Sequence, residues 1–306
     1  MGSSMVQISA DLLCRLARAR EIEFRPDRLP RSGWLRTSDG VRLHYLDWPG
    51  EDDVLLLLHG GGLSAHTFDL LALALGGRIR RIALDMRGHG LSEWADQYPV
   101  DRFAADVVEL IDDLRLEAVH VAGMSFGGCV AGHTAPLLRN RLKSLTFIDV
   151  ADEVNFAASA RMRAFFDRVR PVLQVEDLVT QALAVSPQTD PDLMLYRYQY
   201  LLKPGPDGFT LRTDRRRRAD YAAILGKLAE LTGLAPRLSC PVLVVKGGRS
   251  RVVSQRRLEQ FAGRFPDGAW TVIPDAGHNV QEDQPVRLAA ALRDTIARGR
   301  TRMTDV

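Results

Sequence analysis

Short apolar runs alternate with longer amphipathic segments along most of this 306-residue chain. The clearest runs are "VLLLL" (54–58), "IALD" (82–85), "AVHVAG" (118–123) and "LTFIDV" (145–150). Apolar runs this short are typical of strands that are buried on both faces, as in a parallel sheet. Because parallel strands need crossover connections, the alternation predicts an α/β fold with a mostly parallel sheet flanked by helices.

The alternation stops after residue 150 and resumes at "PVLVV" (241–245). Residues 151–236 show helical stretches but no clear buried strand. We therefore expect a core made of residues 1–150 and 237–306, with a helical cap (151–236) inserted after the sixth core strand. Aromatic side chains of the cap suit a pocket for a ring-bearing or acyl substrate, and helix packing explains them equally well; they are Phe156, Phe165, Phe166, Tyr196, Tyr198, Tyr200 and Phe209.

Charge and composition exclude several classes of function. The net charge is only +3, and 41 basic residues are interleaved with 38 acidic ones, so we expect no nucleic-acid partner. One basic block (215–218) is expected to be solvated, with capture of an anionic substrate as the alternative. The longest aliphatic run (54–58) is too short to cross a bilayer, and Asp11 and Arg15 interrupt the N-terminal apolar residues, so we expect neither a membrane segment nor a signal peptide.

The three cysteines favour a reducing compartment. Cys14, Cys129 and Cys240 are far apart, odd in number and without metal-binding spacing, which predicts a cytoplasmic protein with no metal site.

Three leucines near the N-terminus, Leu12, Leu13 and Leu16, predict a short amphipathic helix. The helix is expected to pack on its own domain, with a lid or a dimer contact as alternatives, so both a monomer and a homodimer stay open.

A candidate nucleophile lies between a predicted strand and a predicted helix. Gly123-Met-Ser125-Phe-Gly127 matches the pattern G-x-S-x-G, in which a sharp strand-to-helix turn exposes the serine hydroxyl. Small residues on both sides let the two backbones approach each other. The helix that begins at Phe126 also favours negative charge beside the serine. Ser125 is therefore the predicted nucleophile.

The glycine-rich "HGGG" (59–62) also follows a predicted strand. Acyl transfer develops an oxyanion, which is usually stabilised by two backbone N–H groups. We expect these donors to be Phe126 and Gly61, with Gly62 as the second choice in the glycine loop. Neither a G-x-G-x-x-G nor a Walker pattern is present, so a nucleotide cofactor is not expected.

The general base is expected late in the chain. His278, in "PDAGH" after the last predicted strand, follows both the nucleophile and the candidate acids. Five of the other six histidines have simpler structural explanations in predicted strands, turns or helices. His66, which follows the glycine loop, is a weaker candidate for lining the substrate pocket.

Together these motifs resemble the α/β-hydrolase fold superfamily over nearly the whole chain, and within it a capped bacterial branch. The matching segments are "HGGG", "DMRGHGLS" (85–92), "GMSFGG" (123–128), "LTFIDV" and "GH" (277–278), in the expected order. The resemblance implies a Ser-His-acid triad, no cofactor, and a cap that shapes a pocket for a small-molecule substrate. Relatives that cleave epoxides or haloalkanes through an ester intermediate have Asp where this chain has Ser125, so those reactions are disfavoured.

The acid of the triad departs from the usual family pattern. Most relatives carry it in the loop matched here by "KGGRSRVVS" (246–254), often at the position of Arg251. Some haloalkane dehalogenases instead place it at the end of the preceding core strand, which is matched here by Asp149. Asp152, Glu153 or no acid at all are the alternatives. Arg251 either pairs with Asp149, which opposes the triad, or binds a substrate carboxylate.

These expectations favour a serine hydrolase that acts on a small ester, lactone or thioester through an acyl-enzyme. One alternative keeps the fold and changes the reaction, to carbon–carbon bond hydrolysis or to rearrangement of a natural product. A second alternative is a catalytically degenerate member that only binds its ligand.

Overall fold

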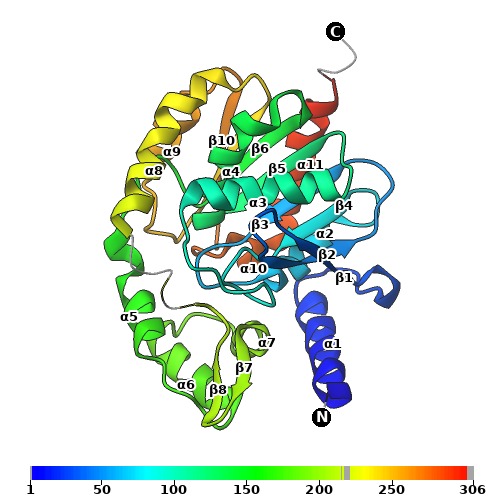
Figure 1. Cartoon of the computed structure of the whole chain (residues 1–306), viewed down its shortest axis with the longest axis vertical. Helices are drawn as coiled ribbons and strands as arrows, with labels where there is room; N and C mark the ends of the chain where they lie inside the picture. Colours follow the sequence, from blue (N-terminus) through cyan, green and yellow to red (C-terminus); the bar gives the residue numbers. More distant parts are fainter. Residues whose placement is uncertain (1, 215, 217–220, 302–306) are drawn as a thin grey trace.

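The computed structural model describes residues 2–214, 216 and 221–301. Its centre is an eight-stranded sheet in the order β1-β2-β4-β3-β5-β6-β9-β10 (Figure 1). β2 is antiparallel to β1 and β4, whereas all pairs from β4 to β10 are parallel, so the predicted mostly parallel sheet is confirmed. The strands are β1 (Arg31–Arg36), β2 (Arg42–Trp48), β3 (Val54–Leu58), β4 (Arg80–Leu84), β5 (Val119–Met124), β6 (Leu142–Ile148), β9 (Val242–Gly247) and β10 (Gly268–Ile273).

Helices cover both faces of the sheet, which is why β3 is apolar at every position. Leu56 and Leu58 of β3 belong to one apolar cluster, and Leu55 and Leu57 belong to another. Figure 1 shows α3 and α4 in front of the sheet, while α2 and α11 pack together on the other face. The core helices are α2 (Asp69–Leu75), α3 (Val100–Asp113), α4 (Phe126–Leu138), α9 (Gln255–Ala262), α10 (Val280–Asp283) and α11 (Pro285–Thr301).

The chain between β6 and β9 is mostly helical, as expected, but it also contains a hairpin. β7 and β8 pair antiparallel around the turn at 205–208, and each strand has only four residues, of which one is buried. Because neither strand is a buried apolar run, the sequence analysis missed both. The elements of the insertion are α5 (Ala160–Arg168), α6 (Val175–Val185), α7 (Pro191–Leu201), β7 (Leu202–Gly205), β8 (Gly208–Leu211) and α8 (Tyr221–Leu234).

Most of the insertion gathers at one end of the molecule (Figure 1), whereas α8 packs against α4 of the core. Phe166 and Tyr198 pack against an apolar cluster that the insertion shares with the core, so helix packing accounts for these two aromatics. The side chain of Phe156, and Arg215, Arg217 and Arg218 of the basic block, lie outside what the structure describes. The division into a core and a separate cap (151–236) stays a prediction.

The N-terminal helix α1 (Gly2–Arg18) packs on its own chain. The predicted apolar positions are buried in one cluster with residues of α2 and α7; the members are Leu12, Leu13, Leu16, Ala17, Ile22, Leu70, Leu73, Leu193 and Tyr196. Packing on the domain therefore explains this amphipathic helix. In the part of the chain that the structure describes, no helix is long and apolar enough to span a bilayer. Cys14, Cys129 and Cys240 form no disulfide among the described residues.

Candidate active site

Ser125 occupies a strained turn between β5 and α4. Its backbone has φ 51° and ψ −117°, a conformation that residues other than glycine rarely adopt. Its N–H donates to the Ile148 carbonyl at 2.9 Å. A Cβ on Gly123 would lie 2.2 Å from the Gly127 carbonyl oxygen, and one on Gly127 would lie 2.1 Å from the Leu58 carbonyl oxygen. The two glycines are therefore required by close backbone contacts, and the turn has the geometry predicted from the G-x-S-x-G pattern.

The structure brings the three predicted triad side chains into one hydrogen-bonded row. Nε2 of His278 lies 3.1 Å from Oγ of Ser125, and Nδ1 of His278 lies 2.7 Å from Oδ2 of Asp149. The imidazole is about one-third exposed, whereas the carboxylate is fully buried. The row therefore runs from the buried carboxylate to the half-buried serine hydroxyl.

Asp149 follows the end of β6, one strand away from the nucleophile. Its backbone is left-handed, with φ 51°, and its N–H donates to the Val245 carbonyl at 2.7 Å. An ionised carboxylate can only accept hydrogen bonds, so the proton between the two side chains belongs to Nδ1 of His278. Nε2 is then an acceptor, which is the form that can take a proton from Ser125.

The loop "KGGRSRVVS" supplies donors to the acid instead of supplying the acid. The Gly247 N–H donates to Oδ1 of Asp149 at 3.0 Å, and the Ser250 hydroxyl donates to Oδ2. The Lys246 ammonium fixes this loop by donating to the carbonyls of Gly247 and Ser250, both at 2.7 Å. With His278, the carboxylate has three donors, which stabilise its charge in a buried position.

The proposed alternatives for the acid and for Arg251 lie elsewhere. Arg251 is exposed, and within the described ranges its side chain makes no ion pair or hydrogen bond, so the predicted alternative of a salt bridge with Asp149 is wrong. Asp152 and Glu153 instead pair with Arg257, at 2.9 and 3.3 Å. A role of Arg251 in substrate binding stays a prediction.

The glycine loop lies at the carboxyl end of β3, beside β5. Gly60 and Leu63 close a turn by an N–H to carbonyl bond of 3.1 Å, and Gly62 adopts φ 83° within it. The His59 ring fixes the turn, because Nδ1 donates to the Gly60 carbonyl at 2.8 Å while Nε2 accepts the Met86 N–H at 3.1 Å. Gly61 thus sits at the exposed tip of a fixed turn.

The other predicted oxyanion donor, Phe126, is the first residue of α4, and its N–H belongs to the positive end of the helix. The oxyanion roles of Phe126 and Gly61 stay predictions, as does a role of Gly62 in substrate binding.

His66 lies between α2 and α7. Its Nδ1 lies 2.8 Å from Oδ2 of Asp69, and its ring stacks on Tyr200 with the centroids 3.5 Å apart. The Tyr196 hydroxyl donates to the same carboxylate, and burial raises the pKa of Tyr196 well above its usual value. These contacts connect the core to the insertion, and a role of His66 in substrate binding stays a prediction.

An ion pair between the insertion and the core supports the histidine loop. The Arg197 guanidinium of α7 pairs with the Glu282 carboxylate, which also accepts hydrogen bonds from Thr67 (2.8 Å) and Asn279 (3.1 Å). Next to it, Asp283 accepts the N–H of Gly277 at 2.7 Å. The sequence analysis missed this support, because residues 85 positions apart give no local pattern.

Replacing Arg197 by Met is expected to destabilise the protein by about 3–5 kcal/mol, because Glu282 would lose its cationic partner in a buried site. The loss is measured by urea unfolding. The double variant Arg197→Met/Glu282→Gln is expected to recover part of it, since both charges are then removed. Equal stability of the wild type and Arg197→Met would contradict a supporting role for this pair.

The comparisons with known proteins agree with this architecture. Residues 55–291 match the model of the alpha/beta hydrolase family. The chain belongs to the alpha/beta hydrolase family. It is 28% identical to a 3-hydroxybutyrate-oligomer hydrolase of Cupriavidus necator, over 86% of this chain and 96% of that protein. It is 27% identical to the esterase Rv0045c of Mycobacterium tuberculosis, over 82% of this chain and 85% of the other.

The structural comparison gives the same fold. The crystal structure of an alpha/beta hydrolase from Novosphingobium aromaticivorans superposes with a TM-score of 0.76 and 24% identity, covering 88% of this chain and 98% of that one. This alpha/beta hydrolase is therefore an enzyme of a family whose named relatives include hydrolases and an esterase. Among the described residues, no group of three or more His, Cys, Asp or Glu side chains is arranged to hold a metal ion.

Proposed function

We propose that this alpha/beta hydrolase cleaves a small ester, lactone or thioester through an acyl-enzyme on Ser125. The observation that carries the proposal is the hydrogen-bonded row from Asp149 through His278 to Ser125, at 2.7 and 3.1 Å. The names of the relatives, an esterase and a 3-hydroxybutyrate-oligomer hydrolase, support the same class of reaction.

In the proposed reaction, Oγ of Ser125 attacks the substrate carbonyl while Nε2 of His278 takes the hydroxyl proton. The N–H groups of Phe126 and Gly61 stabilise the oxyanion. His278 then gives the proton to the leaving group, and the acyl group stays on Ser125. Water, deprotonated by His278, releases the acid product and restores the serine. Throughout, Asp149 keeps the proton on Nδ1 and stabilises the imidazolium.

The experiment that tests this proposal is covalent labelling with a fluorophosphonate, followed by intact-mass measurement. We expect one adduct per chain, because a phosphonylating reagent needs an activated serine, and peptide mapping is expected to place it on Ser125. Ser254→Ala is the matched control: this serine is exposed, and its hydroxyl caps α9 by accepting the Arg257 N–H, so the variant should still be labelled.

Folded protein that takes no label would refute the acyl-enzyme and favour a member of the family that only binds its ligand. Labelled protein that cleaves no ester, lactone or thioester, but cleaves a bond beside a ketone, would favour the carbon–carbon alternative.

A further inference from the structure

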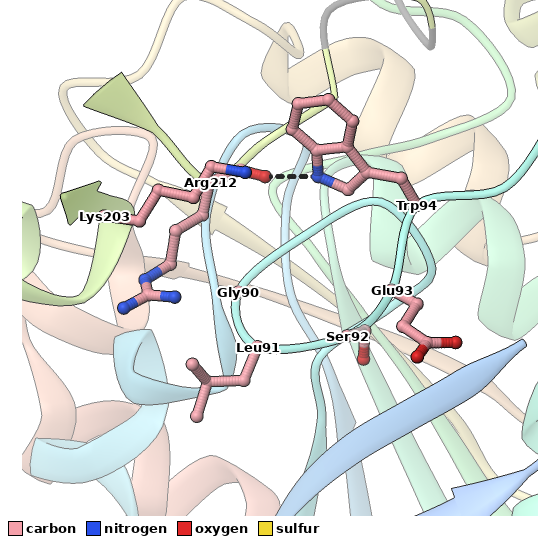
Figure 2. A pocket seen from close by; sticks show the side chains of 7 residues that line it. All are labelled: Gly90, Leu91, Ser92, Glu93, Trp94, Lys203 and Arg212. Atoms are coloured by element: carbon pink, nitrogen blue, oxygen red, sulfur yellow. Dashed lines mark hydrogen bonds between the residues drawn. The ribbon is translucent and has the colours of Figure 1, made fainter. Parts of the chain in front are cut away.

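A cavity lies between the loop that follows β4 and the hairpin of the insertion. Its volume is about 250 Å³, and Figure 2 shows its lining, which consists of Gly90, Leu91, Ser92, Glu93, Trp94, Lys203 and Arg212. None of the triad residues lines it. The cavity is therefore lined by other side chains than those of the triad.

Two cations line this cavity, and neither forms an ion pair with a carboxylate among the described residues. The Lys203 ammonium lies 4.2 Å from the centre of the Trp94 ring. Over the described part of the chain, the half-buried Arg212 guanidinium has no hydrogen-bond or ion-pair partner, although the Trp94 indole N–H donates to the Arg212 carbonyl at 2.7 Å. An anion that neutralises a half-buried cation stabilises it strongly, because it offsets the cost of removing the charge from water.

The nearby carboxylates are already engaged elsewhere. Glu93 accepts the Arg42 N–H at 2.9 Å, and in Figure 2 its side chain points away from Arg212. Asp85 accepts the N–H groups of Ala65 (2.7 Å) and Leu91 (2.9 Å) and also contacts His44. Burial lowers the pKa of Arg212, and attraction to Asp85 offsets only part of that effect. The positive charge at the cavity is thus not balanced by its own lining.

The loop after β4, which lines the cavity, is tied to the glycine-loop segment of the candidate active site. The bond from Ala65 to Asp85 and the bond from Met86 to His59 tie the loop after β4 to the glycine-loop segment. β4, β3 and β5 are successive neighbours, and their carboxyl ends share one edge of the sheet. Two strand spacings put the ends of β4 and β5 roughly 10 Å apart, so the loop that lines the cavity begins within the reach of a short aliphatic chain attached to Ser125.

We propose that Arg212 and Lys203 form a subsite for a carboxylate at the far end of the substrate, while the apolar faces of Leu91 and Trp94 contact the chain that precedes it. The subsite deepens the function proposed above and rests on it. The substrate class is then an ester, lactone or thioester whose acyl part ends in a second, ionised carboxyl group. A guanidinium suits this role because it binds a carboxylate through two parallel hydrogen bonds.

The kinetic test compares p-nitrophenyl hydrogen adipate with its neutral methyl ester, and repeats the pair with the longer suberate. We expect the wild type to prefer an ionised substrate by roughly 10- to 100-fold in kcat/KM, the gain of a charge-assisted contact. Arg212→Gln is expected to lose this preference and to keep kcat/KM for the methyl ester within about twofold. Arg256→Gln, on the exposed surface of α9, removes the same charge and should keep the preference.

A binding test separates the subsite from the reaction. In the Ser125→Ala background, adipate or suberate is expected to raise Tm, and Arg212→Gln should abolish the rise. An Arg212-dependent rise in Tm without any ester cleavage would support the subsite and refute the hydrolase function. If neither the kinetic preference nor the Tm shift depends on Arg212, the subsite is refuted. Stabilisation by inorganic phosphate alone would overturn the carboxylate assignment.

Discussion

Replacing Ser125 by Ala is expected to lower kcat for ester hydrolysis by roughly 10⁴- to 10⁶-fold, the range seen when a serine hydrolase loses its nucleophile. The physical reason is the position of the hydroxyl: it lies 3.1 Å from Nε2 of His278 and at the tip of a turn fixed by Gly123 and Gly127. Alanine keeps the turn but removes the attacking oxygen. The measurement is the initial rate on p-nitrophenyl esters of short acids.

The remaining activity of Ser125→Ala is itself informative. Backbone N–H groups that stabilise an oxyanion still act when the serine is absent, so a rate above that of the uncatalysed reaction is expected to persist. Ser254→Ala should keep full activity and lose about 1 kcal/mol of stability, since only a helix cap is removed. If Ser125→Ala hydrolysed the esters as fast as the wild type, the nucleophile would have to be another group.

The central fold could be predicted from the sequence because it depends on local patterns. Each apolar run is short and buried on both faces. "VLLLL" is strand β3, and "LKSLTFIDV" (142–150), which predicts a strand, gives β6, which ends two residues earlier. The hairpin β7–β8 could not be predicted, because its strands lie between helices and are largely half-exposed. Their position depends on tertiary contacts, such as the pairing of Val172 with Phe209.

The candidate site divides in the same way. Ser125 and His278 lie in recognisable short motifs, and their approach follows from the shared carboxyl edge of neighbouring parallel strands. The acid was harder to predict, because the usual loop has Arg251 where relatives often have Asp. In the structure, the carboxylate follows β6. The segment at the end of β9 supplies two of its hydrogen-bond donors, the N–H of Gly247 and the hydroxyl of Ser250.

The contacts between the insertion and the core could not be predicted, because they join distant residues without a motif. Arg197 meets Glu282, and Arg212 lies beside the loop that carries Trp94. In both places a basic residue of the insertion faces the core from which the triad is built. Arg197 is neutralised by Glu282, whereas Arg212 forms no ion pair with a carboxylate among the described residues. This difference separates a structural role from a proposed binding role.

Replacing Asp149 by Asn is expected to lower kcat by about 10⁴-fold, as loss of the orienting carboxylate does in a serine protease. An amide that donates to Nδ1 of His278 would move the ring proton to Nε2, where it can no longer accept the proton of Ser125. The neutral amide also stabilises the imidazolium less. The measurement is kcat on the same esters, together with the rate of fluorophosphonate labelling, which should fall in parallel.

Asp152→Asn is the matched control for this variant. Asp152 is also buried and lies three residues further along the chain, but it pairs with Arg257 (2.9 Å) and Arg264 (3.3 Å) rather than with His278. Its replacement should lower the free energy of unfolding and leave kcat within a few-fold. Arg251→Gln should likewise keep kcat, because the arginine does not contact the triad carboxylate. If Asp149→Asn kept kcat within tenfold, the carboxylate at the end of β6 would be a structural group, and the histidine would have to act without an orienting acid.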